Sequence, residues 1–408
     1  MRPTNGHRPL MLLAALFLAS LTLRPQLVGI GPLLSAIRRS LGVSHSVAGL
    51  LSTVVLLCMG VFAPMAFVIA RRAGTRWTIA GALTLIAGFG MARVLTKPPA
   101  AVILLTLPIG IGIAVAGSLM PLVVRESWSR RPVLGTSAYT TGIGLGAAVA
   151  AAVAVPLEHA FGSWRDSLAA FSLFTAAMVV VWIALTRGYG GRAVAAAGSL
   201  PRLPLRMGVA WLLVALFALV SITYYGVNAW LPSSFTERGW SHASAGALLT
   251  VVNAVTVPVG VFLAFRGDVF GSRRFWLGAG AISQLAGLLG VILAPDAGWA
   301  WAVLIGGGIG LLFPSLMLMP LDVADRPADV GAMAALMLGA GYTLSSAGPA
   351  LLGLARDAAG SFTLAIWLMV AVTALVLGIA LLISNERLRR HPRARAAPEP
   401  AEPVASVN

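Results

Sequence analysis

Arg24 places a positive charge inside the first long apolar stretch of the chain, residues 9–37. A guanidinium at the centre of a bilayer costs roughly 2.5–3.5 kcal/mol on insertion scales. Arginine does not lose its proton to escape that cost. No carboxylate lies near the middle of any apolar stretch, because every Asp and Glu falls at a segment end or in a connection. A buried cation without a protein counter-ion favours an anion delivered from outside.

The chemistry that Arg24 offers is recognition of a small anionic or strongly polar group. Its forked donors suit carboxylate-like and other oxyanionic groups better than a lysine ammonium does. The alternative is a structural role, in which Arg24 bonds backbone carbonyls that Pro25 frees. The sequence leaves both roles of Arg24 open. The structural role would leave the chain without an anchor for a charged solute.

Other polar side chains in apolar stretches could complete a binding site. Tyr224, Tyr225 and Asn228 lie at positions i, i+1 and i+4, so Asn228 shares a helix face with a tyrosine. Polar residues in membrane helices also join helices to one another, which is their alternative role. The full set of predicted substrate-binding residues is Arg24, Gln26, Tyr139, Thr140, Tyr224, Tyr225, Asn228, Asn253 and Tyr342.

The elements that carry these residues are predicted to be membrane helices. The 408 residues are 58% hydrophobic and 10% charged, whereas an average soluble domain has about 25% charged residues. Stretches of about 20 apolar residues can span a bilayer, and the sequence contains twelve of them. They cover 9–37, 46–70, 77–96, 100–124, 133–156, 166–186, 207–231, 243–265, 275–294, 299–321, 331–355 and 362–384.

Basic residues predict how the chain crosses the membrane. Alternate connections are rich in arginine, such as Arg71, Arg72 and Arg76, and the positive-inside rule places these connections and both termini in the cytoplasm. The opposite connections hold few basic residues: Arg38, Arg39, Arg93, Lys97, Arg165, Arg238 and Arg356. Arg24 is then the one basic residue expected away from a membrane edge. The net charge of +16 therefore indicates orientation in the cytoplasmic (inner) membrane, and we expect no nucleic-acid partner.

An internal repeat divides the chain into two halves. Residues 42–55 align without gaps on residues 239–252, and nine of the fourteen positions are identical. Parallel repeats of this kind occur in transporters built from two six-helix halves. We expect a six-helix bundle over 1–186, a cytoplasmic linker rich in Gly, Pro and Arg over 187–206, a second bundle over 207–386 and a disordered tail over 387–408. The repeat also places Tyr224 and Tyr225 within about one turn of the depth of Arg24.

Several sequence motifs resemble the major facilitator superfamily. The loop at residues 70–76 resembles that superfamily's signature between helices 2 and 3, although it lacks the usual aspartate. More narrowly, the chain resembles the cyanate/nitroimidazole transporter branch, CynX/NimT. The motifs that carry this resemblance are Leu23-Arg24-Pro25, residues 31–34, 56–64, 139–141, 162–165 and 225–232, and Phe313-Pro314. The resemblance implies two pseudo-symmetric six-helix bundles and a permease for small molecules such as cyanate.

These observations predict an all-α integral membrane transporter that moves a small anionic or polar solute by alternating access. Facilitated diffusion, anion exchange and proton-coupled symport all fit, as do import and export. A drug or metabolite efflux permease of the same fold is an alternative, although such pumps usually carry a membrane carboxylate. An embedded enzyme or sensor is a remote alternative, since no catalytic constellation such as His-Glu-x-x-His occurs. We expect a monomer in the lipid bilayer, with no cofactor. We also expect no metal, because Cys58 is the single cysteine.

Overall fold

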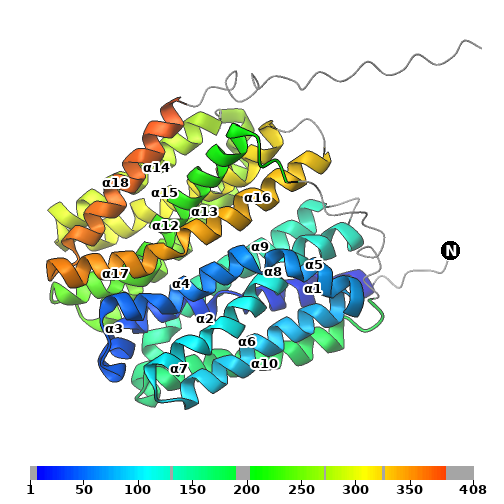
Figure 1. Cartoon of the computed structure of the whole chain (residues 1–408), viewed down its shortest axis with the longest axis horizontal. Coiled ribbons are helices and arrows are strands. Elements are labelled where there is room, and N and C mark those ends of the chain that lie inside the picture. The colour runs from blue at the N-terminus through cyan, green and yellow to red at the C-terminus, as the bar shows by residue number, and fades with distance from the viewer. Residues whose placement is uncertain (1–6, 129–131, 190–202, 271–272, 324–326, 383–408) are drawn as a thin grey trace, which may run out of the picture.

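A computed structural model describes residues 7–128, 132–189, 203–270, 273–323 and 327–382, and every regular element in these ranges is a helix. Most of the predicted linker and the whole predicted tail after residue 386 lie outside the described residues. In Figure 1, helices α1 to α10 occupy one side of the molecule and helices α12 to α18 occupy the other.

The described helices confirm an all-helical membrane protein. Eleven candidate spans are long and apolar enough to cross a bilayer, or twelve if a pair bent by 59° counts as one. The bent pair is α4 (His45–Val61) and α5 (Ala63–Ala73), and Pro64 lies in the first turn of α5. The other spans of the first half comprise α6 (Thr75–Leu95), α7 (Pro99–Leu104), α8 (Thr106–Ser127), α9 (Pro132–Phe161) and α10 (Trp164–Leu185). Those of the second half comprise α12 (Gly208–Glu237), α13 (His242–Phe270), α14 (Arg273–Leu293), η1 (Pro295–Ala297), α15 (Gly298–Val323), α16 (Pro327–Ser345), α17 (Ala347–Ala359) and α18 (Thr363–Leu382).

The first span is broken into three pieces, α1 (His7–Leu21), α2 (Pro25–Val28) and α3 (Ile30–Leu41). Pro25 lacks the backbone N–H that a continuous helix would need at this position. Arg24 lies in the first break and forms the N-terminal boundary of α2, without a side-chain cap. Discontinuous helices near the centre of a membrane protein commonly form substrate and ion sites.

The two sides of the molecule meet through close helix contacts. The helix α4 packs on α16 and α17, α9 packs on α13, and α3 packs on α12. Glycines allow the backbones to approach, because a Cβ atom at Gly49 would lie 2.7 Å from the carbonyl oxygen of Pro349. A Cβ atom at Gly31 would likewise overlap the carbonyl oxygen of Asn228. Any larger residue at these two positions would force the helices apart.

One end of this interface is closed by polar contacts, and we call it the Asp357 end. Asp357 on α17 accepts bonds from the backbone N–H groups of His45 (3.1 Å) and Ser46 (2.9 Å), and it contacts the His45 ring at 2.7 Å. Ser35 and Ser233 lie 3.0 Å apart between their hydroxyl oxygens. Asp357 thereby caps the N-terminus of α4 from the opposite half of the molecule, where backbone donors and the helix dipole favour a negative charge.

Candidate functional site

Arg24 and Tyr225 join the two halves of the molecule at mid-span. The Nη1 atom of Arg24 donates a hydrogen bond of 2.7 Å to the Tyr225 hydroxyl, and its guanidinium carbon lies 5.8 Å from the centre of that ring. Tyr225 is buried in α12, whereas Arg24 is only partly buried. Among the described residues, no carboxylate forms an ion pair with Arg24. The guanidinium therefore keeps its charge without a protein counter-ion, and its bond goes to a hydroxyl rather than to a freed carbonyl.

Aromatic rings from three helices form the wall that Arg24 faces. Tyr225 packs edge-on against Tyr224, with ring centres 4.7 Å apart, and lies 6.3 Å from Tyr342 on α16. Phe313 on α15 and Phe217 on α12 extend the cluster, at 5.3 Å from Tyr224 and 4.9 Å from Tyr342 respectively. We call these five rings the aromatic wall. Aromatic faces attract cations and planar groups, so a ring face of the wall, that of Tyr225, lies beside a positive charge.

Two asparagines hold the aromatic wall from behind. The Tyr224 hydroxyl donates to the Asn253 Oδ1 atom at 3.2 Å, and the Asn253 amide donates to the Asn228 Oδ1 atom at 3.1 Å. Asn253 also donates to the carbonyl of Leu249, and Asn228 donates to the carbonyl of Tyr224. Both amide donors of Asn253 and one of the two of Asn228 are thus directed at protein acceptors. In this conformation their arrangement orients the tyrosines.

Three predicted site residues lie apart from this cluster in the observed contacts. Tyr139 is half-buried and packs against the large apolar core to which both halves contribute, and it forms no hydrogen bond or ring contact with Arg24 or Tyr225 among the described residues. Thr140 is exposed and bonds the carbonyls of Thr136 and Ser137 in its own helix. Gln26 is fully buried and its amide bonds point toward α6 and α10, away from Tyr225. The structure therefore brings together Arg24, Tyr224, Tyr225, Asn228, Asn253 and Tyr342.

Arg93 is a buried cation that sequence reasoning placed with the basic residues of the membrane edge. It lies near the end of α6, but its side chain is 1% exposed. The Nη2 atom donates to the Gln26 Oε1 atom at 2.6 Å, and the Nη1 atom donates to the Thr106 hydroxyl at 3.3 Å. Tertiary packing buries it, and the position of Arg93 near a segment end gave no sign of that. The one local signal is Gly90, one turn earlier, which leaves room for the partners of Arg93.

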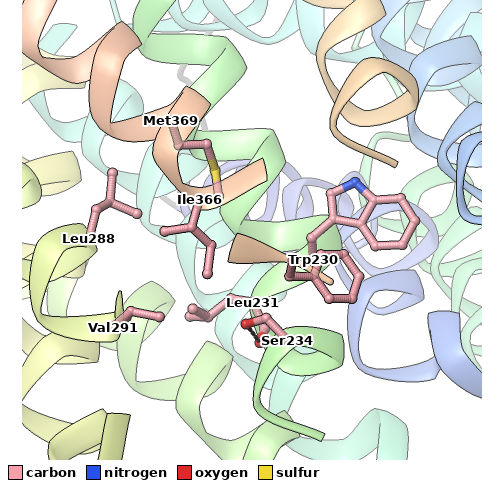
Figure 2. Close-up of a pocket in the computed structure, with 8 residues that line it drawn as sticks. Trp230, Leu231, Ser234, Leu288, Val291, Ile366 and Met369 are labelled. Atoms are coloured by element: carbon pink, nitrogen blue, oxygen red, sulfur yellow. Dashed lines mark hydrogen bonds between the residues drawn. The ribbon is translucent and has the colours of Figure 1, made fainter. Parts of the chain in front are cut away.

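A small apolar pocket lies elsewhere in the second half (Figure 2). Its lining comes from α12, α14 and α18 and includes Trp230, Leu288, Ile366 and Met369. Ser234 is the one side chain in the lining that can donate a hydrogen bond from a hydroxyl group, and no charged side chain lines the pocket. Burying a charged group there would cost several kcal/mol, so this pocket is a poor place for an anion. Among the described residues, no three metal-ligating side chains come together either.

Comparison with known proteins identifies the family. The sequence model of the Major Facilitator Superfamily matches residues 10–349. The chain belongs to this superfamily. It is therefore a multi-pass membrane transporter, not an enzyme, as the resemblance of its motifs predicted.

Two curated relatives cover most of this superfamily member. It is 29% identical over 355 residues to the cyanate transport protein CynX of Escherichia coli (strain K12), which covers 86% of this chain and 91% of that protein. It is 28% identical over 384 residues to the 2-nitroimidazole transporter of the same strain, covering 92% and 95%. Among solved structures, a D-xylose-proton symporter superposes with a TM-score of 0.76 at 14% identity, covering 94% of this chain and 99% of that one. That likeness shows the fold of a secondary transporter.

Proposed function

We propose that this transporter moves a small anionic or strongly polar, planar solute across the cytoplasmic membrane, with Arg24 as the anchor for the solute. The observation that supports this most directly is the partly buried Arg24 guanidinium, which faces Tyr225 and has no carboxylate partner among the described residues. A guanidinium has five N–H donors, and one is directed at Tyr225. The remaining donors can hold an oxyanion or a nitro group in the plane of the fork.

The aromatic wall limits the shape of the solute. Tyr225 and Tyr342 present ring surfaces beside Arg24, and their centres are 6.3 Å apart. A thin group can lie between a guanidinium and a ring with favourable contacts on both sides. Cyanate, named for one relative, is a small linear anion, and 2-nitroimidazole, named for the other, is a small planar heterocycle. Both are compatible with a site that combines one cation with aromatic faces.

Alternating access would occur by rocking of the bundle 1–186 against the bundle 207–386 around this site. Several polar bonds join described residues of the two halves at the Asp357 end, which is therefore closed. The arginine-rich turn at Arg71 and Arg72 lies at the opposite end of the first half. We assign that end and both termini to the cytoplasm by the positive-inside rule, so the Asp357 end faces outward.

The test is solute transport by purified protein in liposomes, with radiolabelled cyanate and 2-nitroimidazole measured separately in both directions. Arg24→Ala should abolish transport of cyanate while the protein still inserts and folds. Arg24→Lys should retain partial activity at most, because an ammonium lacks the forked geometry. Arg125→Ala, which removes an exposed arginine in the last turn of α8, is the matched control and should transport normally. Near-normal transport by Arg24→Ala would overturn the proposal.

A further inference from the structure

The short helix α2 presents two polar side chains in opposite directions. Successive residues of an α-helix are rotated by roughly 100°, so positions two apart point to nearly opposite sides. Arg24, at the boundary of α2, reaches Tyr225 on α12. Gln26 reaches Arg93 on α6 and Ser172 on α10. The segment that carries the candidate anchor is thus attached to its own half of the molecule through Gln26.

This segment needs an external attachment because its own helical bonds cannot hold it. A helix of four residues is far below the length at which helices are stable alone. Its first residue is Pro25, and Arg24 provides no side-chain cap. The residue that follows α2 is Gly29, where a Cβ atom would lie 2.5 Å from the Phe171 ring. Packing on α9 and α10, together with the side-chain bonds of Gln26 to α6 and α10, therefore holds the segment that carries Arg24.

The contacts of Gln26 satisfy both ends of its amide. The Oε1 atom accepts the 2.6 Å bond from Arg93, and the Nε2 atom donates to the Ser172 hydroxyl at 2.9 Å and to the Leu168 carbonyl at 3.3 Å. Gln26 and Ser172 are buried, with 0% and 2% exposed. Gly90 leaves space for them, because a Cβ atom there would lie 2.5 Å from the Ser172 hydroxyl oxygen. The contacts are thus directional and closely fitted.

The charge of Arg93 has a definite use in this arrangement. Hydrogen bonds from a cation are roughly twice as strong as neutral ones, so Arg93 holds Gln26 more firmly than a neutral donor would. Its location in the last turn of α6 offsets part of the desolvation cost, since the C-terminal end of a helix favours a positive charge. Its Nε atom is buried without a hydrogen-bond partner among the described residues. An apolar side chain would fill this volume without the cost of burying a charge and an unbonded Nε atom.

We propose that Arg93 and Gln26 form a clamp that positions Arg24 in the binding site. Arg93 is a positioning residue, which acts through α2 and does not itself contact the solute. The inference rests on the proposed function, because that function gives Arg24 a solute to bind. The positioning of Arg24 against Tyr225 itself requires no solute. Gln26, predicted from the sequence as a substrate ligand, receives a different role here.

The experiment reads the position of Arg24 through its contact with Tyr225, without any ligand. The chain has only five tyrosines, so protein labelled with 3-fluorotyrosine gives a fluorine NMR spectrum that can be assigned with single Tyr→Phe variants. Arg24→Gln removes the contact with Tyr225 and should shift the Tyr225 resonance. Its chemical shift is the reference for a lost contact. Gln26→Leu should move the Tyr225 resonance toward that value. Gln26→Glu, whose carboxylate still accepts from Arg93, should leave it near the wild-type position.

The controls separate positioning from loss of folding. Gln26→Leu leaves Arg93 buried with only its 3.3 Å bond to Thr106, so the double variant Gln26→Leu with Arg93→Met is included, because replacing both partners by apolar groups avoids a buried cation without its main acceptor. It should be folded and still show the displaced resonance. Ser167→Ala removes a different buried hydroxyl bond of α10 and should leave the resonance unmoved.

An unchanged Tyr225 resonance in the double variant overturns the clamp, as does an unchanged resonance in Arg24→Gln. Failure of the proposed function is recognised separately, by normal cyanate transport in Arg24→Ala. If the clamp and the proposed function are both correct, Gln26→Leu should raise the KM for cyanate transport at least fivefold. The same substitution should have no further effect on residual transport in an Arg24→Gln background.

Discussion

The hydrogen bond between Arg24 and Tyr225 combines two chemical functions at one point. The hydroxyl fixes one arm of the guanidinium, and the ring offers a π-face at 5.8 Å. Tyr225→Phe removes the first function and keeps most of the second. A single hydrogen bond is worth about 0.5–1.5 kcal/mol, so we expect the KM for cyanate transport to rise roughly 2- to 12-fold. The loss should be smaller than for Arg24→Ala, and equal losses in the two variants would show that Arg24 cannot hold the solute without its bond to the Tyr225 hydroxyl.

The asparagines behind the wall yield a second prediction at the residue scale. Asn253 bridges the Tyr224 hydroxyl and the Asn228 amide. Asn253→Leu fills the same space but leaves both partners without this bond, and an unsatisfied buried group costs about 1–3 kcal/mol. We expect a lower midpoint of thermal unfolding together with weaker transport. Asn253→Asp keeps an acceptor for Tyr224 and introduces a negative charge behind the aromatic wall, so it should repel an anionic solute. Its second oxygen faces the Asn228 Oδ1 atom, so the Asn228 amide must turn and donate to it for the network to persist. Unimpaired cyanate transport by Asn253→Asp would contradict an anionic substrate.

The contrast between Arg24 and Arg93 shows how far residue patterns alone predict the site. The depth of Arg24, the absence of central carboxylates and the aligned repeat together placed Tyr225 within reach of Arg24, and the structure shows that contact. Arg93 lies near the end of α6, as many solvated cations do, so its position along the chain did not distinguish it from Lys97. Likewise, the partners of Gln26 come from helices far along the chain. Which side chains meet depends on how each helix is rotated about its own axis. The spacing of residues along the chain does not specify that rotation for the short helices on either side of a break.

At the scale of elements, the capping of α4 by Asp357 joins two helices that would separate when the Asp357 end opens in the proposed transport cycle. The backbone N–H groups of His45 and Ser46 would then lose this acceptor. A capping bond contributes typically about 1 kcal/mol, and each 1.4 kcal/mol changes a population ratio tenfold. We therefore expect Asp357→Ala to shift the protein toward the outward-open state by roughly five- to tenfold.

This shift can be measured by labelling a cysteine at Ser233 with a membrane-impermeant maleimide. In a Cys58→Ser background, Ser233→Cys should react faster when Asp357→Ala is also present. Asp296→Ala removes an exposed acidic residue from η1 and provides the control, which should leave the labelling rate unchanged. Equal rates with and without Asp357 would show that the cap does not hold the closed state.

The helix boundaries were the most predictable elements, and the breaks within helices were the least. Ser44 and Ser241 lie directly before α4 and α13 and accept bonds from the N–H groups of Val47 and Ser244, as serine at a helix N-cap commonly does. The break after Leu21 could be anticipated from Pro25, because proline removes a helical donor. The second break at Gly29 and the bend between α4 and α5 depend on packing against neighbouring helices. Hydropathy reports that a segment is apolar, and it is insensitive to such bends.

At the scale of the whole molecule, alternating access requires that the Asp357 end open once in each transport cycle. Ser35 on α3 and Ser233 on α12 provide a way to prevent that, because their hydroxyl oxygens lie 3.0 Å apart across the interface. This spacing is compatible with a disulfide after replacement of both serines by cysteine. In a Cys58→Ser background, oxidation of the Ser35→Cys and Ser233→Cys pair should stop transport, because the two halves can no longer separate at this end. Reduction should restore it.

The design distinguishes a locked interface from chemical damage. Ser241→Cys with Ser244→Cys places a pair at the same end, where the serine hydroxyls are 2.9 Å apart, but both residues belong to the second half. Oxidation of that pair should leave transport intact. The locked protein should still bind cyanate presented at the opposite end, since the Arg24 site lies between the two ends and the lock does not touch it. Undiminished transport by the fully oxidised Ser35–Ser233 pair would mean that the halves do not move apart there, and that the solute takes a route other than alternation around Arg24.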